Sequence, residues 1–328
     1  MILNPIDVLK QFPVRFTKTQ KQQFRAAVEA YAKQQGYSVQ TENGSFGTRN
    51  LVIGDPEQAK YVISAHYDTS ANMVLPNLVI PFNMGLFVLY QLLHSVALIL
   101  SAVLGGLLLG AGVFLAGLFL ASQENGWIVV IAAMLTCLYG VVLLSFLFLA
   151  RMFFGPANKN NANDNTSGVV ALLETLRTFP ENQRSKVCFV LFDLDQKGLW
   201  GAKSYRSAHK DVLERQLVIN LDCVGDGDSM FLFPTKKIRE NRKQLTSLYK
   251  MCGYMGKKSI LVREKGFSGY PSDHKLFPRG VGICAFRKNK LCYYIGRIHT
   301  SRDTVLDETN VNILRAALTT FICRDEVN

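Results

Sequence analysis

Apolar and polar positions divide the chain into two kinds of segment. From about residue 78 to residue 154 apolar residues continue almost without charge, whereas the rest alternates short apolar runs with polar stretches. Short apolar runs are typical of buried strands, and apolar positions three or four apart are typical of amphipathic helices. The pattern therefore predicts a globular part that is interrupted by a hydrophobic insertion.

Strands and helices alternate in the globular part. We predict helices over 18–35, 169–179, 204–215, 240–255 and 307–322, and strands over 37–41, 50–54, 61–65, 186–192, 216–221 and 281–286. This alternation predicts an α/β fold: a three-layer arrangement in which a twisted, mostly parallel sheet has helices on both faces. The expected boundaries are 1–78 and 156–328 for the two parts of this domain, and 79–155 for the insertion.

The insertion contains two stretches long enough to cross a membrane. Residues 85–121 and 127–150 contain no Asp, Glu, Lys or Arg, and Glu124 lies in the break between them. A helix needs about 20 apolar residues to cross a bilayer. If the strands on both sides belong to one sheet, the chain must return to the side it left. We therefore predict a two-span transmembrane hairpin, with 86–96 as a peripheral or tilted extension; the alternative is a helical hairpin buried in a soluble protein.

Composition and charge support a membrane location. The 328 residues are 48% hydrophobic and carry a net charge of +12. No nucleic-acid-binding motif accompanies this charge, so we expect no nucleic-acid partner, and contact with an anionic lipid bilayer explains it better than solubility alone. Arg151 and Lys159 follow the second stretch, which by the positive-inside rule places the globular domain on the cytoplasmic side of the cell membrane. The start of the chain lacks a signal peptide, which agrees with this orientation.

The cysteines exclude one kind of metal site. There are seven of them, an odd number, and no two form a Cys-x-x-Cys pair. Neither a disulfide framework nor a thiolate zinc site is indicated, and we expect free thiols in a reducing compartment.

Polar motifs follow the predicted strands, where α/β sheets collect their ligand sites. They are His66-Tyr67-Asp68, Asp164 in NANDNTSG, Asp195-Gln196, Asp222 in NLDCVG, and His299 in HTSRDT. Imidazoles and carboxylates are zinc ligands where thiolates are absent. Each motif alone also has a structural explanation: His66 as a hydrogen-bonded strand end, Asp164 as a helix N-cap and Asp222 as part of an acidic turn.

Together the motifs resemble the zinc-dependent exopeptidases of the bacterial leucyl aminopeptidase, glutamate carboxypeptidase and glutaminyl cyclase type, family twenty-eight of the metallopeptidases. The matching phrases are ISAHYDT, NANDNTSGVVALLE, VLFDLDQKGLWGAKSY, NLDCVG, SDHKLF and HTSRDT. The resemblance implies an aminopeptidase-like enzyme that hydrolyses a peptide substrate with metal-activated water. Together with the hydrophobic insertion, it predicts a membrane-anchored metallopeptidase.

The resemblance also implies a role for each site residue. The implied metal ligands are His66, Asp164, Asp222, His299 and Gln196, with Asp164 shared between two ions. Asp68 would orient His66, and Asp195 would be the catalytic base. His274, in the pocket-wall candidate 270–274, competes with His299 for the last ligand position, and the family pattern favours His299.

The sequence departs from the family where paired glutamates become Asp195-Gln196. Aspartate is one methylene shorter, so the reach of the base falls by roughly 1.5 Å. Gln196 offers a neutral oxygen in place of a carboxylate, so the sequence predicts one zinc and leaves the second open. Activity is favoured because Asp195 can still act as a base. A single-zinc glutaminyl cyclase-like acyltransferase and an impaired or dead domain that binds peptides or a membrane partner stay open, as does the oligomeric state.

Overall fold

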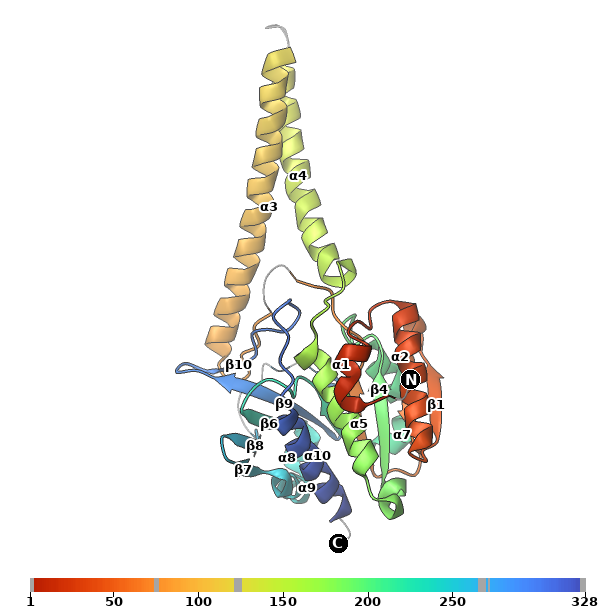
Figure 1. Cartoon of the computed structure of the whole chain (residues 1–328). Helices are drawn as coiled ribbons and strands as arrows, with labels where there is room; N and C mark the ends of the chain where they lie inside the picture. Colours follow the sequence, from red (N-terminus) through yellow and green to blue (C-terminus); the bar gives the residue numbers. More distant parts are fainter. Residues whose placement is uncertain (1–2, 74–76, 121–125, 265–269, 271, 325–328) are drawn as a thin grey trace. The chain divides into compact units, whose positions relative to one another are not determined.

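The computed structural model of the chain describes residues 3–73, 77–120, 126–264, 270 and 272–324. It divides into two compact units, one made of Met1–Met84 with Ala157–Asn328 and the other of Gly85–Pro156. The first is a globular α/β domain and the second is a pair of long helices (Figure 1).

A mixed sheet forms the centre of the globular domain. Its strands are β1 (Val39–Asn43), β2 (Arg49–Ile53), β3 (Tyr61–His66), β4 (Val187–Phe192), β5 (Leu217–Leu221), β6 (Ser229–Pro234), β7 (Gly253–Met255), β8 (Lys258–Val262), β9 (Gly280–Lys288) and β10 (Tyr293–Tyr294). Within the described residues their order is β1-β2-β4-β3-β5-β9-β6-β8-β7, and β10 pairs with β9. The central strands β4, β3, β5 and β9 are parallel, whereas β1–β2, β2–β4, β6–β9 and β7–β8 pair antiparallel.

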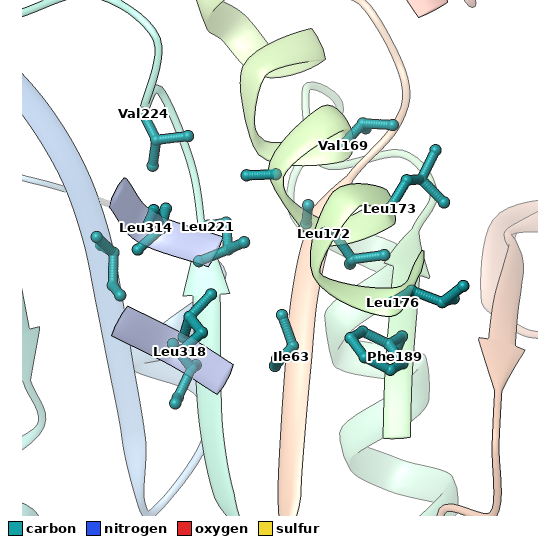
Figure 2. Packing of buried hydrophobic residues seen from close by; sticks show 14 of the residues in the cluster. Ile63, Val169, Leu172, Leu173, Leu176, Phe189, Leu221, Val224, Leu314 and Leu318 are labelled. Carbon is teal, nitrogen blue, oxygen red and sulfur yellow. The ribbon is translucent and has the colours of Figure 1, made fainter. Parts of the chain in front are cut away.

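Helices cover both faces of the sheet, as the alternating pattern predicted. They are α1 (Val8–Gln11), α2 (Lys18–Gln34), α5 (Gly168–Thr178), α6 (Trp200–Ala208), α7 (Lys210–Leu213), α8 (Lys236–Glu240), α9 (Arg242–Leu248) and α10 (Glu308–Cys323). Successive strand residues enter different cores, because side chains alternate along a strand: Ile63 packs with α2, α5 and α10, and Val62 packs with α6 and α7. Figure 2 shows the α5 leucines over Ile63 and Phe189. The predicted α/β fold is confirmed.

Two predicted helices are wrong in extent. The segment 204–215 is split at His209 into α6 and α7, and 240–255 contains α9 followed by the strand β7. Asn241 separates α8 from α9, because its side chain accepts the Gln244 N–H and so starts a new helix. Gly256, with φ +62°, turns the chain from β7 into β8. The strands β6 and β8 were not predicted.

The insertion forms two long apolar helices, α3 (Met84–Leu120) and α4 (Gly126–Phe154). By length and composition Met84–Phe119 and Gly126–Arg151 could each cross a membrane. The predicted extension 86–96 belongs to one uninterrupted helix, and Glu124 lies outside the described residues. A Cβ on Gly140 would lie 3.0 Å from the Gly106 Cα, so small residues allow α3 and α4 to approach closely.

Candidate metal centre

The ends of the central strands bring the predicted residues together. His66 is the last residue of β3, Asp222 directly follows β5, and Asp195 lies three residues beyond β4. Asp164 lies in the irregular turn Ala162–Ser167 that leads into α5. Neighbouring parallel strands end at one edge of the sheet, which is why residues distant in sequence meet here.

Three of these side chains form a buried cluster of potential metal ligands. The His66 Nε2 lies 3.2 Å from Asp164 Oδ1 and 3.8 Å from Asp222 Oδ1. One ligand atom from each residue lies within 4.8 Å of the other two. One imidazole and two carboxylates are a donor set that suits a catalytic metal ion with an open coordination position. The residues present therefore fit the metal that the sequence predicted.

Asp68 contacts both His66 and the loop after β4. Its Oδ1 lies 3.5 Å from His66 Nδ1, and its backbone carbonyl lies 3.2 Å from the same nitrogen. The same carboxylate accepts the backbone N–H groups of Asp195 at 3.0 Å and Gln196 at 3.2 Å. Asp68 is thus placed to orient His66, and it also fixes the Asp195-Gln196 loop, which the sequence did not indicate.

The Asp195 carboxylate lies directly beside the cluster. Its Oδ2 is 3.6 Å from His66 Nε2, although the side chain is one methylene shorter than glutamate. Leu194, with φ +54°, bends the loop just before it. Burial raises the pKa of Asp195 to about 7, because it disfavours the charged form; His66 lowers that pKa, and the carboxylate of Asp68 adds to the rise. A carboxyl group that titrates near neutrality suits proton transfer.

Asp164 accepts hydrogen bonds from the two residues, Gln196 and His299, that the resemblance implied as ligands of a second ion. The Gln196 Nε2 donates to its two oxygens at 3.1 and 3.3 Å, and His299 Nε2 lies 2.7 Å from Asp164 Oδ2. The other ring nitrogen of His299 is 3.3 Å from the Met73 sulfur. Burial would raise the pKa of Asp164, but the charge and hydrogen bonds of His299 and His66 hold it well below its usual range. The glutamine amide therefore acts as a donor toward Asp164.

His274 is placed apart from the cluster. It is buried, its ring stacks on Tyr270 at a centroid distance of 5.8 Å, and burial lowers its pKa to about 3. The Tyr270 hydroxyl donates to the Asp222 carbonyl at 3.1 Å, so part of the 270–274 segment contacts a cluster residue. Pro271 lies outside the described residues. The structure brings His299, and not His274, to Asp164.

Sequence reasoning missed Asp303 and Asn165, which support the turn that carries Asp164. Asp303 accepts the backbone N–H groups of Asn163 at 2.8 Å and Asp164 at 3.0 Å. Asn165 donates to the Leu221 carbonyl at 2.9 Å and so joins the Asp164 turn to the strand that carries Asp222. Both lie inside quoted motifs, HTSRDT and NANDNTSG. Their place in those motifs indicated that they lie near the site, but the sequence did not indicate which groups they would bind.

A buried arginine lies beneath the same loops. Arg15 is fully buried, and its Nε donates to the Tyr67 carbonyl at 2.6 Å while an Nη donates to Thr166 at 3.0 Å. Burial lowers its pKa to about 10, and the charges of Asp68 and Asp164 act in the opposite direction. Its guanidinium therefore ties the His66 loop to the Asp164 turn. No sequence pattern marked this residue.

The fold and the cluster at its strand ends define an aminopeptidase-like hydrolase domain. The model of peptidase family M28 matches residues 151–321, slightly more than half of the chain. The chain belongs to peptidase family M28.

Solved structures agree on the fold. One structure of the LapA aminopeptidase of Legionella pneumophila superposes with a TM-score of 0.53 at 15% identity, covering 97% of this chain and 68% of LapA. Another LapA structure gives a TM-score of 0.53 at 13% identity, covering 99% and 73%. At such identity the likeness concerns the fold alone. No curated protein sequence matches this chain.

Proposed function

We propose that this chain is a membrane-anchored zinc metallopeptidase of the aminopeptidase type. The observation that carries the proposal is the buried group of His66, Asp164 and Asp222 at the strand ends of an M28 domain. These ligands leave a coordination position for water or substrate, which a catalytic zinc site requires. Peptide bonds of a peptide substrate are the proposed target.

Metal binding, proton transfer and positioning would fall to different side chains of the site. A zinc held by the three ligands would polarise the scissile carbonyl and make water more acidic. Asp195, 3.6 Å from His66, would take the proton from the attacking water and return it to the leaving amine. Asp68 would hold the ligand His66 and the base Asp195 in fixed positions relative to each other, because it contacts His66 and accepts the backbone N–H of Asp195.

We propose one zinc ion per chain. Gln196 donates to both oxygens of Asp164, which a neutral amide can do and a carboxylate cannot. With this contact in place, His299 and Asp164 lack the third, anionic ligand that a second ion would need. His299 would then serve as a hydrogen-bond donor to Asp164 rather than as a ligand.

The helices α3 and α4 are proposed to anchor the domain in the cell membrane as a two-span hairpin. Their apolar length supports this, with mean hydropathies of 2.4 and 2.5. The basic residues Arg151, at the end of the second span, and Lys159, after it, support a cytoplasmic globular domain. Proteolysis of sealed vesicles tests the orientation, because cleavage of the domain only from the luminal side would contradict it.

The activity test uses the full chain purified in detergent. Metal analysis should give one zinc per chain, and peptides with a free amino terminus should be cleaved while their acetylated counterparts are not. Asp195→Asn should keep the zinc and lower kcat by about 10²–10⁴, the usual contribution of general base catalysis. His66→Ala should lose the zinc. A folded wild-type chain that binds no zinc would refute the proposal.

A second function is favoured by the Gln196–Asp164 hydrogen bonds, because they leave a single-metal site. Such a site suits a cyclising acyltransferase of the glutaminyl cyclase kind as well as a peptidase. Peptides with amino-terminal glutamine distinguish the two: loss of ammonia without peptide-bond cleavage indicates the acyltransferase. Zinc binding with neither reaction would indicate a peptide-binding domain.

A further inference from the structure

A large cavity lies at the amino-terminal ends of the central strands, whereas the metal-ligand cluster lies at their carboxyl ends. Its volume is about 790 Å³, and its lining includes Tyr61, the first residue of β3, and Leu217, the first residue of β5. His66 is the last residue of the same β3 strand, five residues further on. At about 3.3 Å per residue the two ends of β3 are roughly 16 Å apart. The cavity is therefore separate from the proposed active site.

The side chains around this cavity are strongly basic. The cations that line it are Lys60, Arg242, Lys243, Lys250 and Arg279. The described lining residues include no aspartate or glutamate. The cations come from three separate parts of the chain, so a single charged run along one solvated helix does not explain them. Cations that converge on one hollow focus a positive potential and attract anions.

Arg279 provides a donor that the protein itself leaves unused. One of its Nη groups donates to the Arg215 carbonyl, while its buried Nε has no hydrogen-bond partner among the described residues. Burial lowers the pKa of Arg279, because it disfavours the charged guanidinium. Guanidinium groups bind phosphate oxygens through paired N–H donors, so an anion would satisfy this side chain.

The floor of the cavity is apolar. It contains Leu217 and the rings of Tyr61 and Phe321, which meet edge to face at a centroid distance of 5.7 Å. A rim of cations above such a floor suits a compound that has several phosphate charges and an apolar part. We propose that this cavity, called here the basic cavity, binds a phosphorylated compound, either a soluble one or the headgroup of an anionic phospholipid. The inference does not depend on the peptidase activity.

The test measures binding of sodium tripolyphosphate to the full chain in phosphatidylcholine nanodiscs by calorimetry. Arg242→Glu/Lys243→Glu removes two exposed cations from the rim. It places acids in the first turn of α9, where the helix dipole accepts them. The matched control, Lys257→Glu/Lys290→Glu, makes the same charge change on exposed lysines outside the basic cavity. A single cooperative melting transition near that of the wild-type chain in both variants verifies that they fold.

We expect saturable binding with one site per chain, weakened at least tenfold in the Arg242→Glu/Lys243→Glu variant and less than twofold in the control. Equal weakening in both variants would show that binding responds only to net charge. Equal binding in all three proteins would show that tripolyphosphate is bound at the metal cluster. Either result overturns the inference, and so does binding that does not saturate. Nanodiscs with phosphatidylglycerol identify the source. Weaker tripolyphosphate binding there indicates competition by the lipid headgroup, and unchanged binding indicates a soluble compound.

Discussion

The ion pair between Lys21 and Asp193 connects α2 to the loop that carries Asp195. The Lys21 Nζ lies 2.6 Å from Asp193 Oδ1, and the two side chains are only 7% and 2% exposed. Asp193 directly follows β4 and lies two residues before Asp195. Its carboxylate also accepts the backbone N–H groups of Arg49 at 3.1 Å and Leu194 at 2.9 Å. Lys21→Met therefore removes the charged partner and leaves the backbone donors in place.

Removing one partner of a buried ion pair costs about 3–5 kcal/mol, because the other charge stays buried without compensation. The two backbone donors to Asp193 offset part of this, so we expect Lys21→Met to lower the free energy of unfolding by about 3 kcal/mol, the low end of that range. Lys33→Met on the same helix is the control. Its pair with Glu29, at 2.7 Å, is 58% and 39% exposed, and an exposed pair of this spacing contributes about 0.3–0.5 kcal/mol.

Denaturant unfolding of the full chain in detergent measures both variants, with Trp200 fluorescence as the signal in a Trp127→Phe background. The double variant Lys21→Met/Asp193→Asn should recover part of the lost stability, because the neutral amide no longer needs a cation. A double-mutant cycle then gives the coupling energy of the pair. If Lys21→Met is no more harmful than Lys33→Met, the ion pair does not hold the loop and the reasoning fails.

Three further predictions concern the site and its surroundings. Asp303→Asn should weaken zinc binding about 10- to 100-fold, since it loosens the turn that carries a ligand; chelator competition measures this, and unchanged affinity would contradict it. Gln196→Glu should raise the zinc content from one to two per chain, which metal analysis checks. The pKa of His209 is raised by its hydrogen bond to Glu42, against the effect of burial, and further by Glu57. The stability that protonated His209 contributes through these ion pairs is fully present below pH about 6.5, the pKa of a histidine in the unfolded chain. It is lost as the pH rises through the higher pKa of the folded protein. The melting temperatures of wild type and His209→Gln should therefore converge between pH 6 and pH 9.

The site residues at the ends of the central strands could be predicted from the sequence. The apolar runs before His66 and Asp222 are buried on both faces, so they are continuous and their ends are clear. Parallel central strands end at one edge, which brings these residues together without further information. The predicted helix 240–255 is different. The helix α9 ends at Leu248, and the chain continues into β7, which pairs antiparallel with β8 at the end of the strand order. The three residues of β7 are partly or fully exposed, so they carry no apolar pattern that would mark a strand.

The supports of the site could not be predicted, because they depend on partners far away in the chain. Arg15 donates to Thr166, 151 residues later, and Asp303 accepts from Asn163, 140 residues earlier. An arginine near the amino terminus has the same local pattern whether it is exposed or fully buried. Only the packing of α5 and the loops around it gives Arg15 its role.

The pair Asp195-Gln196 separates two properties of the site that a pair of glutamates would combine. Asp195 keeps a carboxylate next to His66, so in the proposed mechanism proton transfer depends on position 195. Gln196 satisfies Asp164 with an amide, whereas a glutamate there would repel Asp164 unless an ion lay between them. We therefore expect the number of bound metal ions to depend on position 196. Because different side chains control them, activity and zinc stoichiometry should change independently: Asp195→Asn should alter the rate alone, and Gln196→Glu the stoichiometry.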